Sequence, residues 1–335
     1  MDTTEGWVGY GRMRYQCRKC GQGYYPLDFG LELSKDSRMS RKKERLVTHL
    51  AARVPYEEAK EIYEELTHLT IGTMTIHRSV QKLGSKLKEK APELPRLSGV
   101  GKQHVTADGV MVNIREEGWK EAQVGAAYEV NESREATEII YAMGLGERAQ
   151  LGDKLYRLSG APEAKETRGM AFVSDAASWL DEMQQLHFPH ATRIVDQWHA
   201  REYVWNVANE FYGLGDKKAK EWGEAKVEKL KTGEQNSLQQ SLNQMRPKTK
   251  KQKEVLENAQ RYFENHGDKM DYPRYEEMGF HVGSGVAEGA CKHVIQGRFK
   301  KAGMRWSRPG IKNLLPLRSL HVNQEWDILI NYQRN

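Results

Sequence analysis

The spacing of hydrophobic residues changes character along the chain. From about residue 40 to residue 90, apolar side chains recur every three or four positions, which predicts three amphipathic helices. Pro55 separates the first two helices, and a short turn containing Gly72 precedes the third. Four apolar residues are expected on the inward face of this third helix: Ile76, Val80, Leu83 and Leu87.

Two helices joined by a short turn form the helix-turn-helix pattern, whose second helix presents its N-terminal residues to DNA base edges. A plain three-helix bundle has the same periodicity, but the basic residues between 38 and 45 favour DNA. The candidate DNA-contacting residues at the exposed start of the third helix are Thr73, Thr75, His77 and Arg78.

After Pro92 and Pro95, which mark a linker, the apolar residues alternate with a period of two. Such alternation is typical of β-strands. It predicts successive strands, followed by a helix at 147–158. The predicted strands are 105–108, 110–114, 122–128 and 137–142.

Two further apolar runs, at 170–174 and 192–195, are short and unbroken. Each is followed by an aspartate, Asp175 or Asp196, and then by a helical pattern, so both runs predict buried parallel strands. Ligands of open α/β sheets gather at the carboxyl ends of such strands. Residues 200–275 are charged and helical in period, and we interpret them as an all-helical insertion.

A third carboxylate stands in an unusual setting. Glu288 lies among glycines in Gly-Ser-Gly-Val-Ala-Glu-Gly-Ala-Cys-Lys (283–292), at the expected start of a helix that Ser284 can cap. The next acidic residue is Glu325, and eight basic residues lie between them in a chain of net charge +6. A solvated surface normally mixes both signs, so we expect this run to bind a polyanion.

The DNA-binding candidates of this run are Lys292, Arg298, Lys300, Lys301 and Arg305, with Trp306 as a stacking face for an unpaired base. A generic basic helix on the outside of the domain is the alternative. Cys291 is expected to be a small buried hydrophobic residue.

Three acids from separate parts of the chain can support the cleavage or transfer of phosphodiester bonds. Two divalent ions about 3.5–4 Å apart can activate a nucleophilic oxygen and stabilise the leaving oxygen, and Mg²⁺ or Mn²⁺ takes carboxylate ligands for this. Asp108, in Val-Thr-Ala-Asp-Gly, would bridge the ions, while Asp175 and Glu288 would each hold one. Taken singly, each acid has an ordinary role as a turn residue, a helix cap or a partner of Lys292.

The order Asp, Asp, Glu and the flanking residues resemble those of DDE transposases. The chain is similar to bacterial insertion-sequence transposases of the ISKra type, close to the Mutator-like group. Nearly the whole chain takes part in the resemblance. The matching segments are 106–112, 173–179, Asp-Gln-Trp-His-Ala-Arg-Glu (196–202), 283–292 and Gly-Met-Arg-Trp-Ser (303–307).

The resemblance implies an α/β fold, an RNase H-like (integrase-type) catalytic domain with a helical insertion before Glu288. It implies DNA strand transfer by Asp108, Asp175 and Glu288, with Asp196 and His199 as the auxiliary Asp-x-x-His signature. The expected domains are a Cys-x-x-Cys knuckle at 1–35, the helix-turn-helix-like domain at 36–95 and the catalytic domain at 96–335.

Cys17 and Cys20 form half of a zinc knuckle, because a structural Zn²⁺ needs four ligands. The other ligands would come from another chain or from His49; a metal-free remnant is the alternative. The chain holds three cysteines, too few for a disulfide framework, and no apolar run of membrane-spanning length.

The sequence therefore predicts a cytoplasmic, nucleoid-associated bacterial transposase. It would bind double-stranded DNA at terminal inverted repeats and at a target, as a homo-oligomer and without a membrane. It would use two Mg²⁺ or Mn²⁺ ions to cut DNA and join the 3′ ends. An RNase H-like nuclease without strand transfer and a domesticated DNA-binding protein are the alternatives.

Overall fold

Two parts of the chain are described separately. The computed structural model covers residues 1–329 except 31–38, 90–92, 100 and 161–168, so Pro92 of the expected linker and the basic residue 38 lie outside it. Residues 95–111 and 121–293 form one unit, here called the sheet unit. Residues 1–94, 112–120 and 294–335 form the other, called the helical unit.

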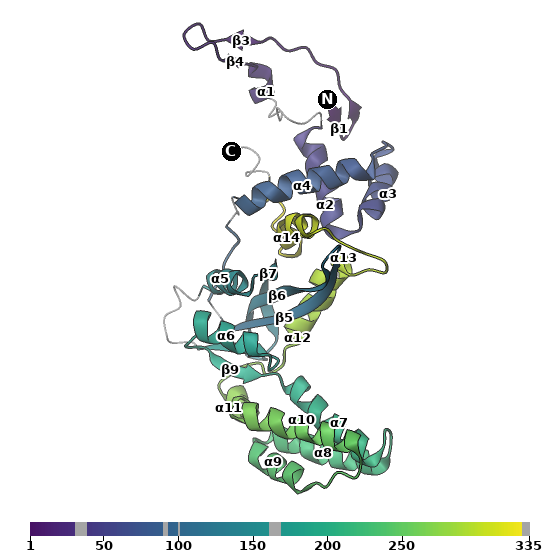
Figure 1. The fold of residues 1–335 in the computed structure, drawn as a ribbon. Coiled ribbons are helices and arrows are strands. Elements are labelled where there is room, and N and C mark those ends of the chain that lie inside the picture. Colours follow the sequence, from purple (N-terminus) through teal and green to yellow (C-terminus); the bar gives the residue numbers. More distant parts are fainter. Residues whose placement is uncertain (31–38, 90–92, 100, 161–168, 330–335) are drawn as a thin grey trace. The chain divides into compact units, whose positions relative to one another are not determined.

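A mixed five-stranded sheet has the order β7-β6-β5-β8-β9; Figure 1 labels four of its strands, β5, β6, β7 and β9. β6 is antiparallel to β7, whereas β8 is parallel to both β5 and β9. A three-residue connection joins β5 to β6, which only antiparallel neighbours allow. The strands are β5 (Lys102–Ile114), β6 (Gly118–Val130), β7 (Ala136–Leu145), β8 (Met170–Ser174) and β9 (Thr192–Val195).

β5 is one continuous strand, and this corrects the two strands predicted at 105–108 and 110–114. Asp108 and Gly109 therefore lie in mid-strand and not in a turn. A Cβ atom at Gly109 would lie 2.4 Å from Oε1 of Glu121 on β6, so any larger residue here would have to displace the Glu121 side chain. The other predicted strands lie within β6, β7, β8 and β9.

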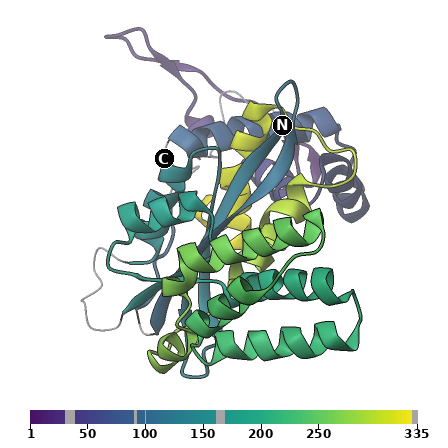
Figure 2. The same cartoon turned by 60° about the horizontal axis from the view of Figure 1, so that its bottom comes forward.

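A layer of helices follows β9 in the sheet unit. α7 packs against α8 and α10, and α9 packs against α8 and α10, as Figures 1 and 2 show. Their apolar faces join those of β8 and β9 in one core. The helices are α7 (Gln197–Tyr212), α8 (Lys217–Lys231), α9 (Gln235–Gln244), α10 (Lys250–His266) and the short α11 (Tyr272–Glu277).

Three shorter helices complete the sheet unit. α5 packs against β7 and against α6. The chain then reaches Glu288 through α12, which continues directly into a π-helical segment at Ala290–Gln296. The bounds are α5 (Arg148–Leu158), α6 (Ser178–His187) and α12 (Gly285–Gly289).

In the helical unit, the three predicted helices are present, and Ile76, Val80, Leu83 and Leu87 are buried as expected. The helices are α2 (Arg41–Arg53), α3 (Tyr56–Thr67) and α4 (Thr73–Glu89). Two small hairpins precede them, followed by the short helix α1 (Pro26–Gly30). The hairpin strands are β1 (Asp2–Thr3), β2 (Gly6–Trp7), β3 (Tyr15–Gln16) and β4 (Gly23–Tyr24).

The C-terminal segment packs with these helices, which differs from the predicted single domain at 96–335. After the short α13 (Gly297–Phe299), helix α14 (Arg308–Val322) lies along α4 and α2. Gly84 of α4 allows this approach, because a Cβ atom there would lie 1.8 Å from the backbone oxygen of Asn313. Among the described residues, every helix is too short or too polar to cross a membrane.

Candidate active site

Three aspartates lie level with one another across the parallel part of the sheet. Val105 of β5 pairs with Phe172 of β8; three residues further along the chain stand Asp108, within β5, and Asp175, directly after the end of β8. Ser174 of β8 pairs with Val195 of β9, so Asp175 and Asp196 also follow paired positions. Register partners share one level of a sheet, and this row lies at the carboxyl ends of β8 and β9, where α/β sheets bind ligands.

Asp108 is partly buried and hydrogen-bonded. Its Oδ1 accepts a hydrogen bond from the Gly109 amide at 2.6 Å, and its Oδ2 accepts one from the Cys291 thiol at 3.1 Å. Burial raises the pKa of Asp108 above its ordinary value, and the charge of Asp175 raises it further, against those two hydrogen bonds. A cation placed beside Asp108 would therefore stabilise the charged form of its carboxylate.

Cys291 connects the predicted acids. Burial raises the pKa of this thiol far above its ordinary range, and the charge of Asp108 adds to the effect, followed by those of Glu288 and Asp175. The three carboxylates predicted as a catalytic triad therefore all lie near enough to influence one thiol. Cys291 is buried as predicted, but it is also a hydrogen-bond donor to Asp108, which the sequence did not indicate.

Asp175 begins a tight turn. Its Oδ1 accepts a hydrogen bond from the Ala177 amide at 3.1 Å, while its backbone oxygen accepts one from Arg193 at 2.6 Å. The first helical residue of α6 is Ser178, and the cap position is Ala177. Asp175 thus supports the entry to α6 through one oxygen and keeps the other for a ligand.

Asp196 is fully buried, with an exposed fraction of 0%. Its Oδ1 caps α7 by accepting a hydrogen bond from the Trp198 amide at 2.8 Å, and its Oδ2 accepts one from the Ser284 hydroxyl. Ser284 was expected to cap the Glu288 helix, but its side chain makes no capping bond there. The Ser284 hydroxyl reaches Asp196 instead, because the buried carboxylate needs the donor.

Glu288 approaches the Asp-x-x-His pair. Ligand atoms of Asp196, His199 and Glu288 all lie within 4.8 Å of one another, and within the described parts of the chain this is the group of three that could hold one ion. His199 Nε2 lies 3.9 Å from Asp196 Oδ2. Glu288 is half exposed and lies 3.5 Å from Lys292 Nζ. Among the described residues, Glu288 is thus grouped with the two predicted auxiliary residues and not with Asp108 and Asp175.

The segment that leads to Glu288 is bonded to the sheet. The amide of His281 donates a hydrogen bond to Nε2 of His104 on β5 at 3.0 Å, and the amide of Gln197 donates one to the carbonyl of Val282 at 3.2 Å. With the Ser284–Asp196 bond, these contacts fix the entry to α12 at three successive points. Such a path can hold Glu288 at one place relative to the aspartate row.

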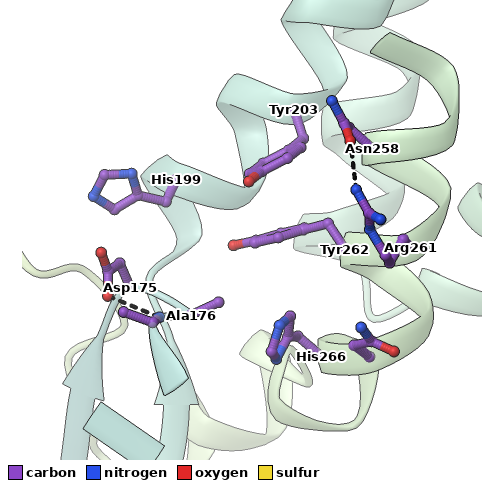
Figure 3. Close-up of a pocket in the computed structure, with 10 residues that line it drawn as sticks. Asp175, Ala176, His199, Tyr203, Asn258, Arg261, Tyr262 and His266 are labelled. Carbon is purple, nitrogen blue, oxygen red and sulfur yellow. Dashed lines mark hydrogen bonds between the residues drawn. The ribbon is translucent and has the colours of Figure 1, made fainter. Parts of the chain in front are cut away.

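A pocket of about 560 Å³ opens beside Asp175 and His199 (Figure 3). Its far wall is formed by α10 and by Tyr203 of α7, whose ring stacks on Tyr262 at 3.8 Å between centroids. Arg261 and Asn258 lie on the same wall and are hydrogen-bonded to each other at 2.6 Å. The sequence analysis missed this wall, because the four residues sit in two helices, α7 and α10, of a segment whose period indicates only a charged helical surface.

Two residues of the predicted basic DNA path are buried, which contradicts that part of the prediction. Arg298 has an exposed fraction of 0%, donates a hydrogen bond to the carbonyl of Ala51 and lies over the rings of Tyr56 and Trp306. Trp306 is 6% exposed and bonds through Nε1 to the carbonyl of Phe299. An arginine enclosed by aromatic rings is attracted by their faces, and neither residue has a surface left for DNA.

The other basic candidates are exposed. Lys292 lies beside Glu288 in the sheet unit. In the helical unit, Lys301 lies 3.4 Å from Glu58, Lys300 stands 5.7 Å from the ring centre of Trp119, and Arg305 has no ion-pair partner among the described residues. An exposed aromatic residue near the acids is Trp198, 55% exposed, with the Arg201 guanidinium 4.3 Å from its ring centre.

At the start of α4, Thr75 and Arg78 are exposed, while Thr73 and His77 are half-buried. The hydroxyl of Thr73 donates a hydrogen bond to Glu57 at 2.8 Å. The ring of His77 stands edge-on to Tyr56, and burial lowers its pKa, with Arg115 adding to the effect. Thr75 and Arg78 are therefore the two members of this set that present free surface.

Cys17 and Cys20 lie in the turn between β3 and β4 and are both exposed. Hydrogen bonds from the backbone at Cys20 and Lys19 lower the pKa of the Cys17 thiol, as in a turn shaped for a metal. His49 stacks on Trp326 at 4.3 Å and lies 3.2 Å from Nδ1 of His321. Because the His49 ring is engaged there, two of the alternatives remain: zinc ligands supplied by another chain, or a metal-free remnant.

The chain belongs to UPF0236, an uncharacterised protein family, whose model matches residues 1–326. It is similar to UPF0236 proteins of Caldanaerobacter subterraneus subsp. tengcongensis. One of them, named for eleven loci from TTE0033 to TTE2212, is 23% identical over 332 residues, covering 96% of this chain and 67% of the relative.

Two more relatives from the same organism, TTE2489 and TTE0402, are each 21% identical over 333 residues. The alignments cover 96% of this chain and 68% and 64% of those relatives. The chain thus spans about two thirds of the length of the curated relatives it matches.

Proposed function

We propose that this chain is a DDE transposase of a bacterial insertion sequence, with an RNase H-like catalytic domain. It would bind the terminal inverted repeats of its element, cut DNA and join the 3′ ends to a target. The observation that carries the proposal is the arrangement of acids: Asp108, Asp175 and Asp196 follow register-paired positions of β5, β8 and β9, and Glu288 lies in one group of possible metal ligands with Asp196 and His199. A mixed sheet and a helical insertion before Glu288 are also what the resemblance implies.

The charges of the site fit divalent cations. In the described part of the chain, Asp108, Asp175 and Asp196 form no ion pair with Lys or Arg, and Glu288 has only Lys292, at 3.5 Å. Four carboxylates at one sheet edge repel one another unless cations balance them. Asp108, Asp175 and Glu288 would hold Mg²⁺, and the ions would lower the pKa of a water or a 3′-hydroxyl and stabilise the leaving oxygen.

The remaining residues would position the DNA. Lys292, one turn beyond Glu288, can neutralise a phosphate next to the acids. Trp198 would take the role first given to Trp306, because its exposed ring lies against Gly283, in the segment that leads to Glu288, and can stack on an unpaired base. In the helical unit, Thr75, Arg78 and Arg305 offer exposed surface for duplex contacts. Assembly of several copies on DNA would bring the two element ends together.

The names of the relatives add independent support. One relative is named for eleven loci, another for four and a third for two. A protein encoded at many places in one genome is what a mobile element produces when it copies or moves itself. For this chain the same reasoning favours a transposase over a domesticated DNA-binding protein.

An assay of cutting and joining tests the proposal. The purified chain is incubated with Mg²⁺, a labelled DNA fragment that carries the gene with both flanks, and a plasmid target. We expect labelled strands joined covalently to the plasmid, and none with Asp175→Asn. Cut strands without joined product would assign a nuclease instead, and intact DNA under these conditions would reject the enzyme.

A further inference from the structure

A second metal-binding arrangement lies beside the proposed triad. The ligand atoms of Asp196, His199 and Glu288 come within 4.8 Å of one another. Two atoms bound to one ion at about 2.0–2.2 Å lie at most about 4.4 Å apart, so His199 Nε2 and Asp196 Oδ2, at 3.9 Å, already meet this limit, and a small side-chain shift brings in Glu288. His199 belongs to the first turn of α7, which Asp196 caps. The imidazole and the buried carboxylate therefore belong to the same first turn of one helix.

Asp196 is a buried carboxylate that forms no ion pair with a Lys or Arg of the described chain. Its two oxygens accept hydrogen bonds from the Trp198 amide and the Ser284 hydroxyl. Within the described residues, the basic group nearest to it in ion-pair range is the His199 ring, at 3.9 Å. Buried carboxylates are normally paired with a cation or coordinate a metal. The two hydrogen bonds also orient the carboxylate, as the outer shell of a metal site does.

The His199 ring is oriented for coordination through Nε2. Its Nδ1 faces Oε2 of Glu202 at 3.4 Å, and its Nε2 faces Asp196. A carboxylate beside Nδ1 favours the proton on that nitrogen and leaves the Nε2 lone pair for a metal. Glu202 thus stands where the second carboxylate of a carboxylate–histidine–metal arrangement is found.

We propose that Asp196, His199 and Glu288 bind one divalent first-row transition-metal ion, for which Mn²⁺ is the probe. Imidazole is a ligand that such ions accept and that Mg²⁺ disfavours, since Mg²⁺ takes oxygen ligands. This inference rests on the proposed function only through Glu288, which the two sites share. His199 and Asp196 would make one metal position of the enzyme selective for a transition metal, while Asp108 and Asp175 hold Mg²⁺.

The test measures metal binding without DNA and without activity. Equilibrium dialysis or electron paramagnetic resonance with Mn²⁺ is carried out on the full chain bearing Cys17→Ser and Cys20→Ser, so that the knuckle does not bind metal. We expect His199→Ala to weaken the affinity for one Mn²⁺ ion by at least about 10-fold. Loss of a residue that only hydrogen-bonds to a metal ligand already costs this much affinity. His190→Ala, at an exposed histidine of the same unit, is the matched control and should bind like the parent.

A conservative variant guards against misfolding. His199→Asp keeps a ligand at this position but exchanges imidazole for oxygen, so it should retain the ion and shift its preference from Mn²⁺ toward Mg²⁺. Equal Mn²⁺ binding by the parent and His199→Ala would overturn the inference, and so would an unchanged preference in a His199→Asp protein that melts like the parent. Neither result affects the cutting assay with Mg²⁺, so the proposed function would fail or stand separately.

Discussion

The hydroxyl of Ser284 donates a hydrogen bond to the buried carboxylate of Asp196. The two residues are 88 positions apart. Asp196 precedes the helices α7–α11 along the chain, and Ser284 follows them. This bond ties the entry of α12, and with it Glu288, to the first turn of α7. It explains why both a serine before Glu288 and an aspartate after β9 belong to the same site.

Ser284→Ala should destabilise the sheet unit and weaken Glu288 as a ligand. The change leaves the Asp196 carboxylate one donor short, and a buried acceptor without its partner costs about 1–3 kcal/mol. Urea unfolding of the purified variant measures the loss. Ser178→Ala, at an exposed serine of α6, should change stability by less than about 0.5 kcal/mol. Equal stability of the two variants would show that the Ser284 bond contributes nothing.

Asp175→Asn should reduce the rate of DNA cutting by several orders of magnitude while the fold stays intact. An asparagine keeps the oxygen that accepts the Ala177 amide hydrogen bond, but it removes the charge that a metal needs. Cutting is measured in Mg²⁺, and DNA binding is measured by a gel shift, where affinity should change little because phosphate contacts come from basic residues. Full cutting activity in this variant would leave Asp175 with a structural role only.

Acidification should destabilise the protein through His104. Its Nδ1 donates to the Lys102 carbonyl and its Nε2 accepts from the His281 amide, so the neutral ring is satisfied on both sides. Burial lowers the pKa of His104 to about 4, whereas an unfolded histidine has a pKa near 6.5. The unfolded chain thus binds the proton first. This contribution to stability is complete above about pH 6.5 and is lost as the pH falls toward 4.

The size of this loss is at most about 3 kcal/mol. His321, whose pKa burial also lowers to about 4, adds a similar dependence in the helical unit, so the comparison must be with a variant. Unfolding free energies are measured between pH 7 and pH 4.5 for the parent chain and for His104→Gln. The variant should be less stable at pH 7 and should show a shallower decline; parallel curves would exclude His104 as the source.

Arg298 and Arg305 should behave differently although both were first expected on the DNA. Arg305→Ala removes an exposed charge and should lower the log–log salt slope of DNA binding by about 1. Arg298→Ala removes a cation enclosed by Tyr56 and Trp306 together with its bond to Ala51. It should destabilise the helical unit by roughly 2–4 kcal/mol and leave the salt slope of the folded protein unchanged.

Both variants are measured by thermal unfolding and by DNA binding from low to moderate salt. Arg78→Ala, at an exposed arginine of α4, is the surface control for stability. An unaltered melting temperature in Arg298→Ala, combined with a reduced salt slope, would return this residue to the DNA surface.

The secondary structure was largely readable from the sequence, because it depends on local periodicity. The inward faces of α2–α4 and the runs at 170–174 and 192–195 appeared where the apolar spacing placed them. The predicted break at Asp108 and Gly109 did not appear, since an Asp-Gly pair indicates a turn only when no neighbouring strand needs it. Here β5 runs on from Lys102 to Ile114, and Glu121 of β6 lies against the glycine.

Candidate acids were also found from the sequence, because a carboxylate after a buried strand is visible as a pattern. Asp175 and Asp196 follow β8 and β9 as expected. What each acid contacts was not visible, since partners come from distant parts of the chain. The bonds of Cys291 to Asp108 and of Ser284 to Asp196 span more than half and about a quarter of the chain respectively.

The sequence by itself determined the helices, the strands and the residue types available for chemistry, because these follow from spacing and side-chain identity. Only the tertiary structure decided which charged residues are free to act. Arg298 and Arg305 have the same side chain and stand seven positions apart, yet one is enclosed by aromatic rings and the other is exposed. Burial is a property of the packed neighbours, and local spacing does not contain them.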